Sequence, residues 1–356
     1  MNSPLSIYAG EEALSQIQSS GFNANMFTAL LGASGGPKWF VLSGLDQVVF
    51  NEFLDKSPQH IDIIGSSAGA FRACCFGQDN PKEAILRLAD KYANTVYSDK
   101  PSPQEITAKG LDILRHMMGE TGINEVLNSV NKRVHIVTAR CHGLVASENK
   151  AKQFSGLAMA AGRNAISRRK LQKSFTRAIF SSSEKHLDFS EKVPLNTEQY
   201  QLKENNFIPA LMASGSIPVV IEGVKNIAGA KAGMYRDGGI IDYHFDMRIN
   251  TPGLVLYPHF YSTPVPGWFD KSIKRRVCHH DSYKNVVMLV PSEEFVASLP
   301  YGKIPDRKDF ETMDAPERIK YWQRVLLESE RLGDEFLNIV TKQNVEALVK
   351  PINLHR

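Results

Sequence analysis

Short, nearly continuous hydrophobic runs alternate along the first half of the chain with segments whose hydrophobic residues recur every three or four positions. The runs at 27–32, 61–64 and 134–138 are apolar and rich in β-branched residues, as expected for strands buried on both faces. Segments 81–95 and 103–118 have helical spacing, and each follows an Asn or Ser next to a proline. This alternation predicts an α/β fold with a central, mostly parallel sheet flanked by helices on both faces.

The same two patterns continue through the second half of the chain, without a long linker, an internal repeat or a low-complexity tract. They predict a strand near 177–181, a helix at about 201–214, strands at 253–258 and 285–290, and a long amphipathic helix at roughly 316–342. We therefore expect a single domain over residues 1–356, which is long enough to bury a sizeable core.

Composition narrows the class of protein. The chain has 356 residues, of which 42% are hydrophobic and 22% charged, as in ordinary soluble globular proteins. Its net charge of +4 is too small to indicate a nucleic-acid partner. The N-terminus lacks a Sec-type signal, and no window approaches the roughly 20 apolar residues that span a bilayer. These features predict a cytoplasmic protein.

The four cysteines show no metal-ligand spacing, so no metal site is predicted. Cys74 and Cys75 are adjacent in an apolar stretch with helical character, which predicts buried thiols and a reducing compartment.

One segment, residues 150–177, differs from the rest in charge. It contains eight basic residues, and the only acid beside it is Glu148. The basic residues are Lys150, Lys152, Arg163, Arg168, Arg169, Lys170, Lys173 and Arg177. Apolar residues such as Phe154 and Ile166 are interleaved with them. The segment is either a solvated basic face or an interfacial segment that contacts anionic lipid headgroups at a membrane surface.

A Gly-x-Ser-x-Gly pentapeptide, from Gly65 to Gly69, follows the 61–64 run and precedes a helix-compatible segment. A strand that enters a helix through so tight a turn exposes a serine hydroxyl at the top of a sheet. Glycines at both ends allow the strand and the helix to approach closely. Ser67, the central serine, is therefore the candidate nucleophile, although the same pentapeptide also occurs as a purely structural turn.

A glycine-rich turn follows the first predicted strand and offers donors for an oxyanion. Gly35 and Gly36 leave their backbone N–H groups unshielded, and Lys38 adds positive charge. A phosphate-binding loop is the rival interpretation, but its Gly-Lys-Ser/Thr pattern is missing, because Pro37 precedes Lys38 and Trp39 follows it.

A carboxylate beside a glycine-rich turn supplies the third group that acyl transfer by a serine needs, a base. Asp237 precedes Gly238 and Gly239, and a carboxylate at such a position can approach a serine closely. Asp-Gly is also common in ordinary turns, so the Asp237 motif indicates a site only in combination with the Gly-x-Ser-x-Gly pentapeptide and the glycine-rich turn. Asp237 is followed in the chain by His244, His259, His279 and His280, so a Ser…Asp…His order is also available.

Together these motifs make the chain resemble the patatin-like phospholipases, a family of serine acyl hydrolases with a Ser-Asp dyad. That family has a glycine-rich oxyanion turn, a Gly-x-Ser-x-Gly elbow, a segment similar to Ala-Ser-x-Ala-x-Pro, and an Asp-Gly-Gly or Asp-Gly-Ala base motif. The corresponding residues here are Gly35-Gly36-Pro37-Lys38, Gly65-Ser66-Ser67-Ala68-Gly69-Ala70, Ala213-Ser214-Gly215-Ser216-Ile217-Pro218 and Asp237-Gly238-Gly239. The resemblance covers about residues 27–243, and 244–356 carry none of its motifs.

The resemblance implies a lipid acyl hydrolase that acts on phospholipid or lysolipid esters. It assigns Ser67 as the nucleophile, Asp237 as the base, and Gly35, Gly36 and Lys38 as the oxyanion site, without a metal or an organic cofactor. Independently of the resemblance, the charge pattern of the basic segment 150–177 suggests peripheral contact with an anionic membrane surface.

The turn departs from the family pattern Gly-Gly-Gly-x-Arg/Lys-Gly at two positions. Ser34 replaces the first glycine and Trp39 the last, which leaves the register of the oxyanion donors open. Trp39 either narrows the entrance for the acyl chain or packs in the core. Two other functions also stay open: an esterase with a His-containing triad that acts on small esters, and a lipid-binding module without turnover.

Overall fold

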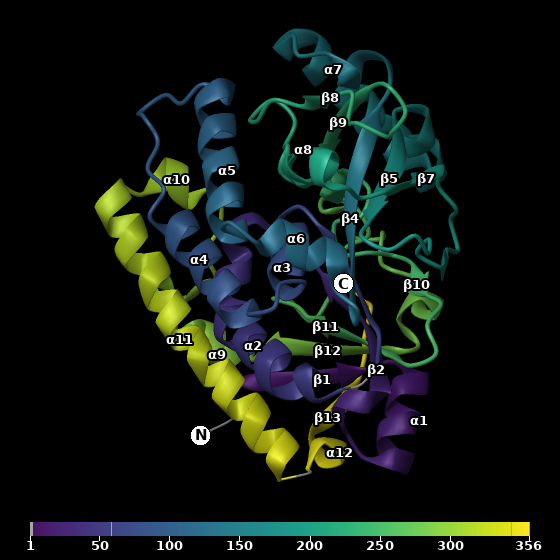
Figure 1. Cartoon of the computed structure of the whole chain (residues 1–356), viewed down its shortest axis with the longest axis vertical. Helices are drawn as coiled ribbons and strands as arrows, with labels where there is room; N and C mark the ends of the chain where they lie inside the picture. The colour runs from purple at the N-terminus through teal and green to yellow at the C-terminus, as the bar shows by residue number, and fades with distance from the viewer. Residues whose placement is uncertain (1–2, 58, 343, 356) are drawn as a thin grey trace.

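The computed structural model describes residues 3–57, 59–342 and 344–355. In these residues the hydrophobic runs form an eleven-stranded sheet, in the order β13-β1-β12-β11-β2-β3-β4-β5-β7, with β9 paired to β4 and β8 to β9 (Figure 1). The strands are β1 (Leu5–Ala9), β2 (Phe27–Gly32), β3 (Ile61–Ser66), β4 (Lys132–Cys141), β5 (Phe175–Ser181), β7 (Thr197–Gln201), β8 (Val224–Lys225), β9 (Met234–Asp237), β11 (Leu254–Pro258), β12 (Val286–Pro291) and β13 (Val349–Pro351). Two further short strands, β6 (Phe189–Ser190) and β10 (Arg248–Ile249), pair with each other.

The centre of the sheet is parallel and its periphery is mixed. Strands β12, β11, β2, β3 and β4 are successive parallel neighbours. Antiparallel pairs join β1 to β12, and β5 and β9 to β4. The predicted α/β fold with a mostly parallel central sheet is confirmed. The predicted strands at 27–32, 61–64 and 134–138 correspond to β2, β3 and β4.

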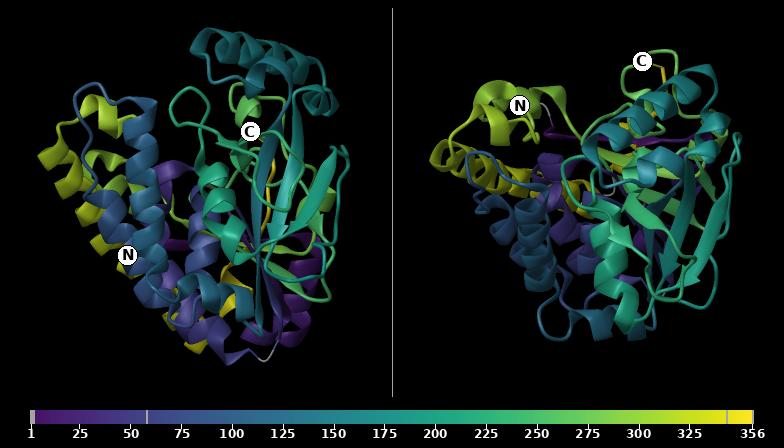
Figure 2. Two further views of the ribbon diagram at one scale, coloured as in Figure 1. Left: turned by 45° about the horizontal axis from the view of Figure 1, so that its top comes forward. Right: turned by 90° about the horizontal axis from the view of Figure 1, so that it is seen from above.

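Helices flank this sheet, and Figure 2 shows most of them gathered to one side of it. They are α1 (Glu11–Ser20), α2 (Ser43–Val48), α3 (Ala68–Phe76), α4 (Pro81–Ala93), α5 (Pro103–Met118), α6 (Gly122–Asn128), α7 (Lys150–Ile166), α8 (Glu204–Gly215), α9 (Glu293–Ser298), α10 (Asp309–Thr312), α11 (Ala315–Thr341) and α12 (Val345–Leu348). The predicted helices at 81–95, 103–118, 201–214 and 316–342 correspond to α4, α5, α8 and α11.

The long helix α11 packs closely on α2. A Cβ added at Gly44 would lie 2.5 Å from the Ser329 carbonyl oxygen, and the Gly44 amide donates to Ser329 Oγ at 2.9 Å. The chain after residue 243 also supplies three strands of the main sheet, β11, β12 and β13, and β11 lies between β12 and β2. The C-terminal third therefore helps to build the sheet that carries the motifs.

In the described part of the chain, no helix is long and apolar enough to cross a membrane. The four cysteines are buried and unpaired with one another, as the sequence predicted for Cys74 and Cys75. Burial raises the pKa of both of these thiols well above the usual value, so they are packing groups rather than nucleophiles.

Candidate active site

Ser67 occupies a sharp turn between β3 and α3. Its backbone has φ 54° and ψ −128°, a combination that a non-glycine residue adopts only under strain. Close backbone contacts make the neighbouring glycines necessary. A Cβ at Gly65 would lie 2.3 Å from the Gly69 carbonyl oxygen, and one at Gly69 only 1.9 Å from the Gly32 carbonyl oxygen. The predicted strand–turn–helix elbow is therefore present, and its glycines are sterically required.

The register of β4 brings Asp237 to Ser67. The last residue of β3, Ser66, pairs with Val137 of β4 in parallel. The last residue of β9, Asp237, pairs with the next residue, Thr138, in antiparallel. The C-terminal ends of β3 and β9 thus meet along one edge of β4. Ser67 Oγ donates a hydrogen bond to Asp237 Oδ2 at 2.8 Å.

Asp237 is buried, and its surroundings tune its basicity. Its Oδ1 accepts a hydrogen bond from the Gly239 amide at 2.7 Å. Burial raises the pKa of Asp237 to about 6, against the opposing effect of the hydrogen bonds from Ser67 and Gly239. A carboxylate with this pKa is ionised at neutral pH yet is a stronger base than a solvated aspartate.

The neighbouring serine, Ser66, has a different environment. Its side chain is fully buried, donates to the Asp242 carbonyl oxygen at 2.6 Å and lies 2.6 Å from Ser34 Oγ. Ser66 therefore links β3 to the segment after β9 rather than facing a substrate. Ser34, which stands where the family pattern has its first glycine, takes part in this same buried contact.

The glycine-rich turn after β2 borders the same cavity as Ser67 and Asp237. Gly36 has φ +57°, a conformation that favours glycine, and a Cβ at Gly35 would lie 2.6 Å from the Phe260 ring. Among the described residues, no hydrogen-bond acceptor takes up the amides of Gly35 or Gly36. These two N–H groups are thus available to a ligand in the cavity.

Lys38 also borders this cavity, and its ammonium group forms an ion pair with Asp306. Burial lowers the pKa of Lys38 to about 8. Trp39, in contrast, is completely buried and packs edge-on against Phe40, with 4.8 Å between ring centroids. Of the two roles open for Trp39, core packing is the correct one, because its ring does not reach the cavity.

The segment that resembles Ala-Ser-x-Ala-x-Pro supports the two reactive side chains. Ser214 Oγ accepts the Ser67 amide at 2.9 Å and donates to the Val137 carbonyl oxygen at 2.7 Å. The Ser216 carbonyl oxygen accepts the Asp237 amide at 3.1 Å. The sequence revealed this segment only through the resemblance, and the structure shows what it contacts.

Ser67 and Asp237 open into a cavity of about 1120 Å³. Part of its lining is apolar and includes Ile106 of α5 and the segment 217–221 after α8. Another part is cationic and includes Lys271 and Arg307. Sequence reasoning missed both cations, because no motif marks the segments that carry them.

Arg307 lies directly beside the glycine-rich turn. Its Cγ would be 3.0 Å from a Cβ added at Gly36. Its charge helps to lower the pKa of Asp237, in opposition to burial. Within residues 3–57, 59–342 and 344–355, no carboxylate forms an ion pair with Arg307. Lys271 Nζ lies 3.7 Å from the centre of the Tyr243 ring, which also lines the cavity.

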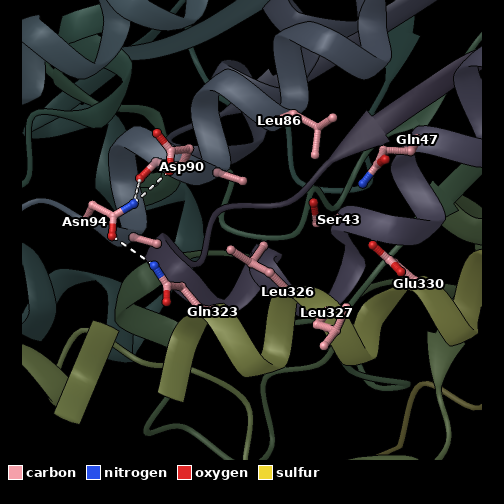
Figure 3. Close-up of a pocket in the computed structure, with 11 residues that line it drawn as sticks. Ser43, Gln47, Leu86, Asp90, Asn94, Gln323, Leu326, Leu327 and Glu330 are labelled. Atoms are coloured by element: carbon pink, nitrogen blue, oxygen red, sulfur yellow. Dashed lines mark hydrogen bonds between the residues drawn. The ribbon is translucent and has the colours of Figure 1, made fainter. Parts of the chain in front are cut away.

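A second, smaller cavity of about 250 Å³ lies between α2, α4 and α11 (Figure 3). Its lining includes Leu86, Asp90 and Leu326 and none of the candidate site residues. The larger cavity is therefore the candidate active site.

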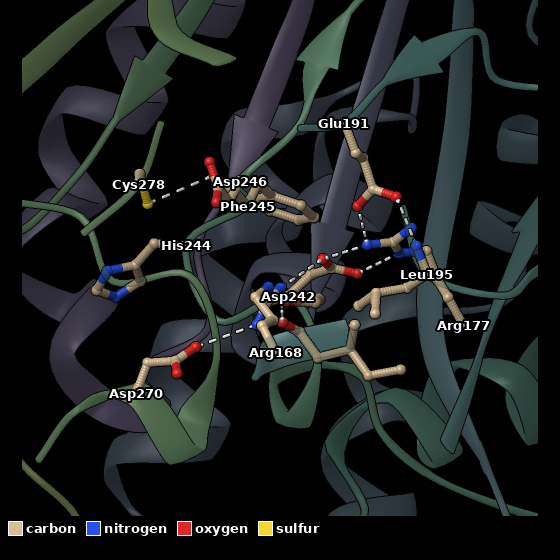
Figure 4. Close-up of polar contacts among 12 residues, drawn as sticks. Arg168, Arg177, Glu191, Leu195, Asp242, His244, Phe245, Asp246, Asp270 and Cys278 are labelled. Carbon is tan, nitrogen blue, oxygen red and sulfur yellow. Dashed lines mark hydrogen bonds and ion pairs between the residues drawn. The ribbon is translucent and has the colours of Figure 1, made fainter. Parts of the chain in front are cut away.

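Two residues of the basic segment 150–177 lie inside the molecule. Arg177 is completely buried, and its guanidinium donates to both carboxylate oxygens of Asp242, at 2.6 and 2.8 Å (Figure 4). A third hydrogen bond, at 2.6 Å, reaches Glu191. Arg168 is 3% exposed and donates to the Ile241 carbonyl oxygen at 2.7 Å.

The expectation that all eight basic residues share one exposed or membrane-facing surface is thus wrong for Arg168 and Arg177. Buried carboxylates surround both guanidinium groups, which makes their burial tolerable. Arg168 also pairs with Asp270 at 3.1 Å. These two arginines hold the segment that follows Asp237, and only the remaining residues can contact a partner.

The four histidines contact groups other than Ser67 and Asp237. His244 Nδ1 accepts the Val265 amide, and His259 Nδ1 accepts the Tyr261 amide, each at 2.9 Å. Burial lowers the pKa of His259 to about 3. His279 Nδ1 lies 2.7 Å from Asp246 Oδ2, and His280 is on the surface. Among the described residues, no group of His, Cys, Asp and Glu is arranged to hold a metal ion.

No model of a known protein family and no curated protein matches this sequence. Among solved structures, the chain is similar to the crystal structure of VipD from Legionella pneumophila, with 13% sequence identity and a TM-score of 0.31. The match covers 72% of this chain and 53% of VipD, so the chain spans about half the length of that protein.

Proposed function

We propose that this protein is a serine acyl hydrolase that cleaves carboxylic ester bonds of lipids through a Ser67–Asp237 dyad. One observation carries the proposal: the 2.8 Å hydrogen bond from Ser67 Oγ to Asp237 Oδ2, made at a strained elbow that opens into a large cavity. An ordinary structural serine needs neither a strained backbone nor a buried carboxylate partner.

In the proposed reaction, Ser67 Oγ attacks the ester carbonyl carbon while Asp237 accepts the hydroxyl proton. The Gly35 and Gly36 amides donate to the resulting oxyanion, and Lys38 adds positive charge beside the turn. Collapse of the tetrahedral intermediate breaks the C–O bond, and Asp237 returns the proton to the leaving alcohol. Water activated by Asp237 then hydrolyses the acyl-enzyme, which releases the fatty acid and restores Ser67. The scheme requires no metal or organic cofactor.

The composition of the cavity supports an amphiphilic ester. Its apolar lining, with Ile106 and the segment 217–221, suits an acyl chain. Its cations, Lys271 and Arg307, suit an anionic group beside the ester. The motifs that resemble the patatin-like phospholipases support the same class of substrate.

Two alternatives are less well supported. A His-containing triad needs an imidazole between serine and aspartate, whereas Ser67 and Asp237 already contact each other directly. A lipid-binding module without turnover needs no unoccupied backbone donors, whereas Gly35 and Gly36 present two beside the nucleophile in the described structure.

A fluorophosphonate probe tests the proposal, because it labels only an activated serine. We expect labelling of the wild type and of Ser66→Ala but not of Ser67→Ala. Mass spectrometry of a lipid panel, with wild type and Ser67→Ala compared, then identifies the ester that is cleaved. Labelling that persists in Ser67→Ala would refute the assignment, and a wild type that is never labelled would favour the lipid-binding module.

A further inference from the structure

The outer face of α7 is apolar and has no protein covering it in the described structure. Phe154 is 69% exposed, Met159 45% and Ile166 71%, and large hydrophobic side chains that gather on one surface indicate an interaction site. With 3.6 residues per turn, these three lie on one arc of the helix, and small residues fill the arc between them. The small residues, all exposed, are Ala151, Ser155, Ala158, Gly162 and Ala165.

The opposite face of α7 is fixed to the body of the protein. Gln153 is buried, accepts the Val219 amide and donates to the Ser147 carbonyl oxygen. Asn164 is also buried and donates to Asp270 at 2.6 Å. Leu157 and Ala160 of the same inner face pack in a hydrophobic cluster, so both polar and apolar contacts fix the helix. The exposed apolar arc is therefore held rigidly toward the outside.

Cations surround this apolar face at both ends. Lys150 and Lys152 are exposed in the first turn of α7. At the other end Arg275 donates to the Ala165 carbonyl oxygen at 3.2 Å and Arg276 to the Asn164 carbonyl oxygen at 2.8 Å. Further exposed cations near that end are Arg169, Lys170, Lys173 and Lys274. Glu148, an exposed acid just before α7, forms an ion pair with Arg236 at 2.8 Å.

The face also adjoins the candidate active site. The residue after Val219, Val220, lines the cavity and is itself 41% exposed. Trp268 lines the cavity as well, two residues before Asp270. Figure 1 shows α7 at the top of the molecule, where one end of α5, whose Ile106 lines the cavity, also lies.

We propose that α7 is an interfacial helix that rests on an anionic lipid surface, with Phe154, Met159 and Ile166 inserted among the lipids and the surrounding cations at the headgroups. Apolar side chains encircled by Lys and Arg are complementary to a bilayer that carries anionic lipid, which offers hydrocarbon beneath negative charge. A protein partner would be expected to pair its own carboxylates with these cations. A membrane that contains anionic lipid offers hydrocarbon for the apolar side chains and negative charge for the cations at the same surface.

Vesicle flotation tests the proposal independently of turnover, with Ser67→Ala as the background. We expect this protein to float with vesicles of equimolar phosphatidylcholine and phosphatidylserine, and less with phosphatidylcholine alone. Adding Phe154→Ser and Ile166→Ser should reduce the bound fraction at least about tenfold, because two large apolar groups are lost from the interface. Both side chains are exposed, so the variant should keep the wild-type circular dichroism spectrum.

Leu327→Ser on α11 is the matched control, because Leu327 is 53% exposed but distant in sequence from the apolar arc. It should bind like the parent. Replacing Lys150 and Lys152 by Glu should weaken binding at low salt, and less at high salt. Equal flotation of the α7 serine variant and the parent would overturn the proposal. The proposal would also be overturned if light scattering showed that the parent is a dimer and that the same substitutions make it monomeric, because a second copy of the chain would then cover α7. If the wild type binds vesicles but is not labelled by the fluorophosphonate, the proposed function is refuted and the membrane proposal is retained.

Discussion

The backbone amide of Ser67 donates a hydrogen bond to Ser214 Oγ at 2.9 Å. Ser214 belongs to α8 and also donates to the Val137 carbonyl oxygen of β4. The candidate nucleophile is therefore tied to the strand that also fixes Asp237. Because the turn at Ser67 is strained, such a contact is needed to hold its dihedral angles.

Ser214→Ala should lower turnover about tenfold while the protein remains folded. The substitution leaves the buried Ser67 amide without its acceptor, which costs about 1–3 kcal/mol, and it loosens the elbow. Ser216→Ala is the control, because the Ser216 side chain donates to Met212 and its backbone contact to Asp237 persists. Steady-state kinetics on a short soluble ester measure the difference. Equal activities of the two variants would contradict a positioning role for Ser214.

Sequence patterns predicted the helices and strands that have long hydrophobic patterns and the turn that is flanked by conspicuous glycines. The apolar runs of β2 and β3 and the Gly65–Gly69 pentapeptide are local features of the sequence, so the elbow was predictable. Strand β9 was not, because its four residues, Met234–Asp237, include two charged side chains and show no periodicity. The approach of Asp237 to Ser67 depends on two registers along β4, which no local pattern encodes.

Charge patterns were less reliable than hydrophobic ones. Arg177 and Lys150 look alike in sequence, but Arg177 is buried against Asp242 and Glu191 while Lys150 is exposed. The partners of Arg177 are 14 and 65 residues away, so only the fold brings them together. The cations of the cavity, Lys271 and Arg307, went unnoticed for the same reason.

Gly36→Val should reduce turnover by about 10²–10³-fold, the usual effect of losing one oxyanion donor. Valine is strained at φ +57°, and its Cβ would meet Arg307, so the amide must rotate away from the oxyanion. Gly143→Val is a matched control, because Gly143 has φ +61° and open space around it. Gly143→Val therefore introduces the same backbone strain at a residue that does not line the cavity. A folded Gly36→Val protein with full activity would place the donors elsewhere.

Arg307→Gln should change substrate selectivity rather than basal activity. Two matched substrates report this: a 1-acylglycerol and the 1-acylglycerol 3-phosphate with the same chain. Hydrogen bonds to charged groups contribute about 1.5–3 kcal/mol, so the preference in kcat/KM for the phosphate-bearing ester should fall about 10–100-fold. Arg324→Gln, on the exposed surface of α11, should leave the preference unchanged. An unchanged preference in Arg307→Gln would exclude Arg307 from substrate recognition.

The pH dependence of activity tests the basicity of Asp237, and substitutions at Asp237 and at the histidines distinguish the dyad from a triad. Because Asp237 must be ionised to accept the Ser67 proton, kcat/KM should rise with pH around a midpoint near 6, the raised pKa of this carboxyl. Asp237→Asn should lower turnover at least about 10³-fold, nearly as far as Ser67→Ala, since members of a catalytic unit are not additive. Substantial turnover should remain after single substitution of His244, His259, His279 or His280 by Ala. A histidine variant as inactive as Ser67→Ala would replace the dyad by a triad.

The same raised pKa predicts a cost in stability that Asp237→Asn removes. The folded-state pKa of Asp237, about 6, lies above the unfolded value of 3.8, so folding favours the protonated carboxyl. Its contribution to stability is fully present below pH 3.8 and is lost as pH rises through 6. At pH 8 the ionised, buried carboxylate destabilises the fold by up to about 3 kcal/mol, since one pKa unit corresponds to about 1.4 kcal/mol. Urea unfolding should therefore show Asp237→Asn to be more stable than wild type at pH 8, with the difference vanishing toward pH 4. A variant that is less stable than wild type at pH 8 would mean that Asp237 is a structural carboxylate, held for its hydrogen bonds rather than for its basicity.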